Sequence, residues 1–101
     1  MSAFNLPSLA HFLGAYFNQD CFHSDPTIEA IVKRFQREEP ADFVDPVQRQ
    51  LRDLVALNLS EARLDLFLRE SGCDYDPLVE FQSRQQWLAY LSELLTTPPD
   101  S

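Results

Sequence analysis

Apolar residues recur along this chain every three or four positions, which is the spacing of one face of an α-helix. The first such run opens at Pro7 or Ser8, because proline suits the first helical position and serine can cap a helix. Its apolar positions are Leu9, Phe12, Leu13, Tyr16 and Phe17. Gly14 lies inside this run and costs about 1 kcal/mol relative to alanine. A glycine at that point indicates that a neighbouring helix approaches closely.

Two aspartate–proline pairs predict the next two helix starts, because aspartate caps a helix and proline suits its first position. Asp25-Pro26 precedes a stripe at residues 28, 31, 32 and 35. Asp45-Pro46 precedes a stripe at residues 47, 51, 54 and 55, with Asn58 as a stop. The pattern also permits a short sixth helical turn near Ala41 to Val44.

The last two predicted helices have signals at their ends. Ser60 can cap the fourth helix, and Gly72 suits the left-handed conformation in which many helices end. Ser83 and Gln86 match the S-x-x-Q capping box of a fifth helix. Trp87 opens its apolar stripe, so we assign this tryptophan to the core. The remaining apolar positions of the two helices are Leu64, Phe67 and Leu68, with Leu66 off the stripe, and then Leu88, Leu91, Leu94 and Leu95.

No segment shows the period-two alternation of a β-strand. The sequence therefore predicts an all-α fold, a single compact bundle of about five amphipathic helices. We expect one domain over residues 1–101, with frayed ends at 1–7 and 97–101. The length of 101 residues suits one modest hydrophobic core.

Composition narrows the class of protein. Apolar residues make up 45% of the chain, which is too much for a disordered protein. No apolar run reaches the ~20 residues of a membrane span, and the N-terminus lacks the basic start and cleavage site of a secretion signal. We therefore expect a cytoplasmic protein. The two cysteines, Cys21 and Cys73, suit such a reducing compartment better than they suit a disulfide framework.

The net charge is −8, with an isoelectric point near 4.5, so the chain repels nucleic acid. Residues 37–101 hold thirteen acidic against six basic residues. Such a surface speeds the encounter with a basic partner; alternatively, it only keeps the domain in solution. Two acidic groups have no basic residue within them: Glu38, Glu39, Asp42 and Asp45, and then Glu70, Asp74, Asp76 and Glu80.

Asp20, Cys21 and His23 are spaced like a thiol nucleophile or part of a zinc site. The end of the preceding helix and the Asp20 carboxylate both disfavour the thiolate that such a nucleophile requires. A structural zinc site needs four ligands, and neither His11 nor Cys73 shows a paired spacing. We assign His11 to a partly buried, hydrogen-bonded position. We therefore predict no catalytic residue, no metal and no cofactor.

The longest predicted connection between helices is GCDYDPLVEFQ, residues 72–82. Its start resembles a calcium-binding loop, but it lacks the glycine and glutamate that such a loop needs at positions six and twelve. We expect a turn in which aspartate side chains bond backbone amides and Pro77 fixes the bend. As a functional hypothesis, this turn is a rigid acidic protrusion with Tyr75 as an aromatic anchor, since tyrosine is enriched at binding hot spots.

Several motifs, in their order and spacing from about residue 8 to 95, resemble one family. They are LAHFLGAYFNQD at 9–20, where the family shows Gly-x-Tyr-Phe-x-x-Asp, IEAIV-x-x-F at 28–35, EEP at 38–40, GCDYDP at 72–77 and WL-x-x-L at 87–91. The chain resembles the immunity proteins of bacterial contact-dependent growth inhibition systems, in a small all-helical family. The family often has an aromatic residue where this chain has Cys21, which argues against a required role for that cysteine.

The resemblance implies a protein that binds and neutralises a cognate toxin domain delivered by a neighbouring cell, and that is not an enzyme. Such toxins are often nucleases with basic substrate-binding faces, so we expect occlusion of the toxin's active site or substrate cleft. The shared residues Tyr16, Phe17, Asp20 and Trp87 are then structural. The candidate partner contacts are Asp74, Tyr75, Asp76 and Glu80, followed by Glu38, Glu39 and Asp42.

For the free protein we expect a monomer or weak dimer, without nucleic-acid or membrane partners. An acidic helical adaptor or regulatory module with a cellular partner is the alternative.

Overall fold

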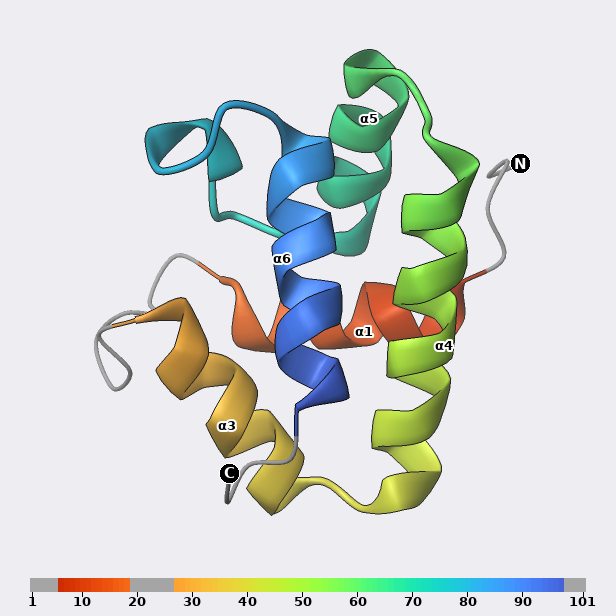
Figure 1. Cartoon of the computed structure of the whole chain (residues 1–101), viewed down its shortest axis with the longest axis vertical. Helices are drawn as coiled ribbons and strands as arrows, with labels where there is room; N and C mark the ends of the chain where they lie inside the picture. The colour runs from red at the N-terminus through yellow and green to blue at the C-terminus, as the bar shows by residue number, and fades with distance from the viewer. Residues whose placement is uncertain (1–5, 19–26, 98–101) are drawn as a thin grey trace.

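The computed structural model describes residues 6–18 and 27–97 (Figure 1). Within these ranges the chain forms five α-helices and one short 3-10 turn, with no strand. The elements are α1 (Pro7–Tyr16), α3 (Ile28–Glu38), α4 (Ala41–Leu57), α5 (Glu61–Ser71), η1 (Pro77–Val79) and α6 (Arg84–Thr96). The predicted all-α class is confirmed. None of the described helices is long and apolar enough to cross a membrane.

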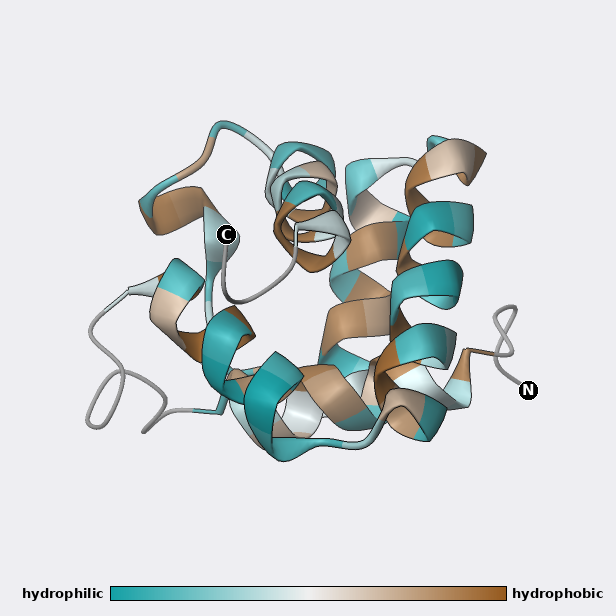
Figure 2. Cartoon of the chain, turned by 60° about the horizontal axis from the view of Figure 1, so that its bottom comes forward, coloured by the Kyte–Doolittle hydropathy of each residue, from teal (hydrophilic) through white to brown (hydrophobic). Residues whose placement is uncertain are grey.

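The helices form a bundle of mixed orientation, measuring 34 × 28 × 21 Å. In Figure 1, α4 and α6 run along the long axis and α1 crosses them. Helix α6 packs against α3, α4 and α5, while α1 packs against α4 and α5. Figure 2 shows that the apolar residues of the helices concentrate toward the interior of this arrangement. The bundle buries the predicted stripes because each helix turns its apolar face inward.

Aromatic side chains form the centre of the core. The Phe12 and Phe35 rings lie 4.3 Å apart between centroids, and the Phe17 ring meets Trp87 edge-on at 5.2 Å. All four side chains are fully buried, which confirms the assignment of Trp87 to the core. Because large aromatic side chains bury the most apolar area per residue, this cluster supplies much of the driving force for folding.

Helix α1 approaches the end of α5 at Gly14, as predicted. A Cβ atom placed on Gly14 would lie 2.4 Å from the carbonyl oxygen of Ser71. Gly72 then ends α5 with φ of +84°, the left-handed conformation expected there. The Cys73 N–H donates to the Leu68 carbonyl at 3.0 Å, so the backbone at this crossing is held by hydrogen bonds.

The predicted start of the third helix at Asp45-Pro46 is wrong. Helix α4 begins at Ala41 and continues through Pro46, so the short turn near Ala41 is the beginning of this helix. The amides of Phe43 and Val44 both donate to the Pro40 carbonyl. Proline in the second turn removes one backbone hydrogen bond. Apolar residues of α4 pack against the core on both sides of Pro46, partly buried before it and fully buried after it, and this packing offsets the loss.

The start of α1 at Pro7 is one of the two that were predicted, whereas the cap of α3 differs from the predicted one. Pro7 is the first residue of α1, whereas Ser8 lies inside the helix and does not cap it. Helix α3 is capped by Thr27, whose side chain accepts a hydrogen bond from the Ala30 amide at 3.1 Å. The predicted cap at Asp25-Pro26 lies outside the described residues. So does the cluster of Asp20, Cys21 and His23.

The other predicted helix ends agree with the structure. Asn58 ends α4 with φ of +51°, and Ser60 caps α5 through a hydrogen bond from the Arg63 amide. Ser83 caps α6 by accepting from the Gln86 amide at 3.0 Å. The second half of the capping box differs, because the Gln86 side chain accepts from the Gln82 amide instead of the Ser83 amide.

His11 is exposed on α1. Its ring meets Phe43 edge-on at 5.4 Å between centroids. The predicted partly buried position is therefore wrong. Helical spacing places His11 at the edge of the apolar stripe of α1, where its side chain faces solvent.

Two tyrosine hydroxyls connect helices through carboxylates. Tyr16 on α1 donates to Glu39 at the end of α3 at 3.0 Å, and Tyr90 on α6 donates to Glu29 on α3. Burial, together with the hydrogen bond to the carboxylate, raises the pKa of Tyr16 and of Tyr90 to about 12. The same contact with Tyr90 lowers the pKa of Glu29.

We expect these tyrosines to make stability fall at high pH. An unfolded tyrosine has a pKa of about 10, so between pH 10 and 12 the unfolded chain loses protons that the folded chain retains. The stabilisation is complete below the unfolded value and is lost as pH rises toward the folded value. A Tyr16→Phe/Tyr90→Phe variant should show a flatter free energy of unfolding over this interval, measured by chemical denaturation. An unchanged slope would contradict this prediction.

Candidate functional site

Residues 72–82, which we call the η1 loop, extend from the bundle between α5 and α6 (Figure 1). The amides of Asp74 and Tyr75 both donate to the Phe17 carbonyl, at 2.9 and 3.2 Å, and so fix the loop to the end of α1. The Asp76 carboxylate accepts from the Leu78 amide at 3.0 Å, and Pro77 is buried. These contacts confirm the predicted turn, with an aspartate bonded to a local amide and Pro77 at the bend.

Tyr75 supports the η1 loop from inside. Its ring is half-buried, 5.2 Å from the Trp87 ring and 6.1 Å from the Phe17 ring. Its hydroxyl donates to the Glu80 carboxylate at 3.1 Å across the loop. A partner can therefore reach only the outer part of this side chain. Besides the binding role predicted for it, Tyr75 has a structural role in the loop.

The carboxylates of Asp74, Asp76 and Glu80 are exposed on the η1 loop. No ion pair among the described residues involves any of them. The nearest arginines already have acidic partners, since Arg84 pairs with Asp65 at 3.2 Å and Arg69 pairs with the same carboxylate at 3.0 Å. The loop therefore presents negative charge that the described part of the protein does not neutralise.

A hollow of about 220 Å³ lies beside the Asp74 and Asp76 carboxylates. Its lining comes from the end of α5, the η1 loop and the start of α6: Asp65, Leu68, Arg69, Cys73, Asp74, Tyr75, Asp76, Pro77 and Arg84. Arg84 is the best buried cation of this set, with 19% of its side chain exposed. Because it also pairs with Glu61 at 3.5 Å, this arginine connects α5 to α6 and holds the wall of the hollow in place.

The second acidic group lies at the connection between α3 and α4. Glu38 is exposed and pairs with Arg34 at 3.6 Å, whereas Glu39 is half-buried and accepts the Tyr16 hydroxyl. Asp42 is exposed in the first turn of α4. The ion pair of Glu38 neutralises part of the negative charge here, whereas no carboxylate of the η1 loop forms an ion pair among the described residues.

The structure does not bring the two acidic groups together. In Figure 1 the η1 loop lies toward the top of the long axis, and the α3–α4 connection lies at the bottom. A partner that centres on one group would meet the other only at the far edge of a standard interface of about 800 Å² per partner. The two sets of candidate residues are therefore alternatives for the centre of a contact.

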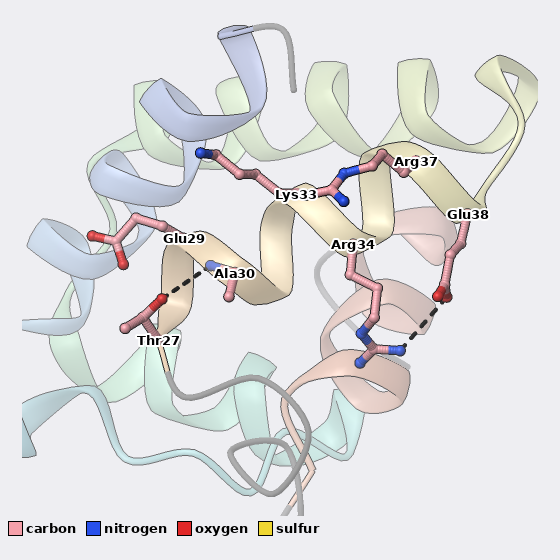
Figure 3. Close-up of a pocket in the computed structure, with 7 residues that line it drawn as sticks. All are labelled: Thr27, Glu29, Ala30, Lys33, Arg34, Arg37 and Glu38. Atoms are coloured by element: carbon pink, nitrogen blue, oxygen red, sulfur yellow. Dashed lines mark hydrogen bonds and ion pairs between the residues drawn. The ribbon is translucent and has the colours of Figure 1, made fainter. Parts of the chain in front are cut away.

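The outer face of α3 is basic, in contrast to the rest of the protein. Lys33, Arg34 and Arg37 line an open hollow of about 590 Å³ together with Glu29 and Glu38 (Figure 3). The Arg34 guanidinium also lies 4.9 Å from the centre of the Tyr16 ring. This face adjoins the α3–α4 acidic group, and its positive charge weakens the negative potential there.

Two apolar residues of the η1 loop were not among the predicted contacts. Leu78 is 46% exposed and Val79 is 77% exposed. A sequence signal existed, because two adjacent apolar residues in a short acidic turn fit no helical stripe. Among the described residues, no group of three or more histidine, cysteine or acidic side chains could hold a metal ion.

The described residues form a small all-α domain with an exposed acidic loop between α5 and α6. The chain belongs to the CdiI immunity protein family, whose model matches residues 5–95. The structure is similar to a chain in the crystal structure of a CdiA-CT/CdiI complex from Y. kristensenii, with a TM-score of 0.80 and 25% sequence identity. That match covers 91% of this chain and 94% of the other. No curated protein sequence matches the chain. The family resemblance found in the sequence motifs is confirmed.

Proposed function

We propose that this protein binds and neutralises the C-terminal toxin domain of a cognate CdiA protein. The observation that carries this proposal is the family match over residues 5–95. The likeness to a solved CdiA-CT/CdiI complex supports a toxin domain as the partner. This immunity protein family is not a family of enzymes, so the protein would neutralise the toxin by binding alone. The adaptor alternative has no comparable support.

The charge of the protein supports a finer proposal about the partner. A net charge of −8 favours a basic partner surface, and a nuclease has such a surface where it binds nucleic acid. The proposed toxin is therefore a nuclease, and the immunity protein covers its active site or substrate cleft. At low salt, electrostatic steering of this kind can raise association rates to ~10⁸ M⁻¹s⁻¹.

The proposed contact surface is the η1 loop, through Asp74, Tyr75, Asp76 and Glu80, with Glu38, Glu39 and Asp42 as the alternative centre. The α3–α4 group is less suited to a basic partner, because the basic face of α3 adjoins it. The proposal further treats residues 1–101 as one domain that acts in the cytoplasm, as a monomer or weak dimer before it meets the toxin.

Co-expression tests the function directly. Cells that produce the C-terminal toxin domain encoded directly upstream of this gene should stop growing, and the wild-type immunity protein should restore growth. An unrelated CdiA toxin domain in the same cells is the specificity control and should remain toxic. If the cognate domain stays toxic in the presence of abundant folded immunity protein, the proposed function is wrong.

A biochemical assay tests the finer proposal. The purified toxin domain should degrade nucleic acid, and an equimolar amount of immunity protein should stop that degradation. A toxin domain with a different activity would contradict the nuclease assignment but leave the neutralising function intact. A complex that still degrades nucleic acid at the full rate would contradict occlusion.

A further inference from the structure

The tip of the η1 loop is an apolar surface within an acidic surrounding. Leu78 and Val79, exposed to 46% and 77%, are adjacent at this tip. Figure 2 shows their turn as an apolar segment at the outer left of the molecule, away from the core. The other large apolar side chains exposed among the described residues are Leu57 and Leu66, at 58% and 55%. Those two belong to regular helices, whereas Leu78 and Val79 stand on a turn that projects from the bundle.

The turn that carries the tip is rigidly held. Pro77 is buried beneath it, and its carbonyl accepts the Phe81 amide at 2.8 Å and the Glu80 amide at 3.2 Å. The Phe81 ring packs against Tyr90 of α6 at 5.5 Å between centroids. Since the backbone at the tip is already ordered, a partner that buries Leu78 and Val79 would pay little additional conformational entropy.

The charges around the tip restrict what can cover it. Asp76 and Glu80 flank the two apolar residues in the sequence, and Asp74 lies just before them; no basic residue occurs between positions 70 and 83. An apolar centre with a charged rim is the usual anatomy of a protein–protein contact. The complementary surface is an apolar pocket bordered by lysine or arginine, which excludes partners with acidic borders.

We propose that Leu78 and Val79 are the apolar centre of the toxin contact, inserted into a pocket of the toxin domain whose rim is basic. This inference rests on the proposed function and adds two binding residues to it. In this arrangement Asp74, Asp76 and Glu80 guide the encounter and set its orientation, and the tip provides the buried area that slows dissociation. The loop thus acts as a preformed plug.

Binding measurements with the purified toxin domain encoded directly upstream test the plug. A Leu78→Ser/Val79→Ser variant should bind at least about tenfold more weakly in calorimetry, mainly through faster dissociation, as expected for hot-spot residues. The matched control, Leu57→Ser/Leu66→Ser, removes two other exposed apolar side chains, at 58% and 55%, and should change affinity less than about threefold. Val79→Ser alone is a second test, because a side chain that is 77% exposed contributes little to folding. Thermal unfolding measurements check that each variant is folded.

The outcomes separate this inference from the function on which it rests. If the wild-type protein does not bind the toxin domain, the function and the plug are both overturned. If the wild-type protein binds and the folded Leu78→Ser/Val79→Ser variant binds equally well, only the plug is overturned. Equal losses in the test and control variants would also overturn it. A tip that instead joins two copies of this chain would reveal itself by sedimentation, as a dimer lost in the variant while toxin affinity is unchanged.

Discussion

Replacing Gly14 with alanine is expected to destabilise the fold by about 3 kcal/mol, at the upper end of the range for overpacking. The new Cβ would lie 2.4 Å from the carbonyl oxygen of Ser71. That oxygen belongs to the backbone, where hydrogen bonds of Gly72 and Cys73 hold the end of α5. The helical preference for alanine returns only about 1 kcal/mol. The free energy of unfolding, measured by urea denaturation, should therefore fall.

The neighbouring residue offers a matched control for this substitution. Ala15 is exposed on the same helix, so Ala15→Gly changes backbone freedom without a steric clash. This substitution should lower the free energy of unfolding by about 1 kcal/mol. Gly14→Ala exchanges the same two residue types in the opposite direction, yet it should lower the free energy of unfolding by more than Ala15→Gly does. A Gly14→Ala variant as stable as the wild-type protein would show that α1 and α5 can separate without loss.

Local signals explain why so much of the fold was predictable. Helical stripes depend on spacing alone, and the caps at Ser60, Ser83 and Gly72 depend on residues within a few positions. The start of α4 was missed because Asp45-Pro46 carries the same local signal as a true helix start. Packing between helices determines where α4 begins. Phe43 packs against Phe35 at 5.5 Å between ring centroids, which favours a helix that extends back to Ala41.

In the candidate site, too, local contacts were predictable from the sequence and contacts between distant residues were not. The bond from the Leu78 amide to Asp76 and the bend at Pro77 are local, and the sequence indicated both. Tyr75 lies against Phe17, 58 positions earlier in the chain, and Glu39 accepts from Tyr16, so neither contact had a signal within the nearby sequence. The separation of the two acidic groups is likewise a property of the packing between helices.

Removing the negative charge of Asp74 and Asp76 is expected to weaken toxin binding about tenfold to a hundredfold at low salt, mostly through slower association. The suitable variant is Asp74→Lys/Asp76→Asn, because asparagine can still accept the hydrogen bond from the Leu78 amide that caps η1. The loop should keep its shape while its charge changes. The difference from wild type should shrink as salt rises toward about 1 M, where the screening length falls to about 3 Å. Stopped-flow association rates at several salt concentrations measure both effects.

The control for this variant must have the same total charge. Asp53→Lys/Glu93→Gln makes an equal change at exposed residues of α4 and α6, away from the η1 loop. If the toxin recognises the local charge of the loop, only the first variant loses affinity and salt dependence. If it responds to the net charge of −8, both variants slow association equally, and the carboxylates of the loop are not contacts. Wild-type rates in both folded variants would remove electrostatic steering from the mechanism, and the apolar tip of the η1 loop would then have to provide the affinity without it.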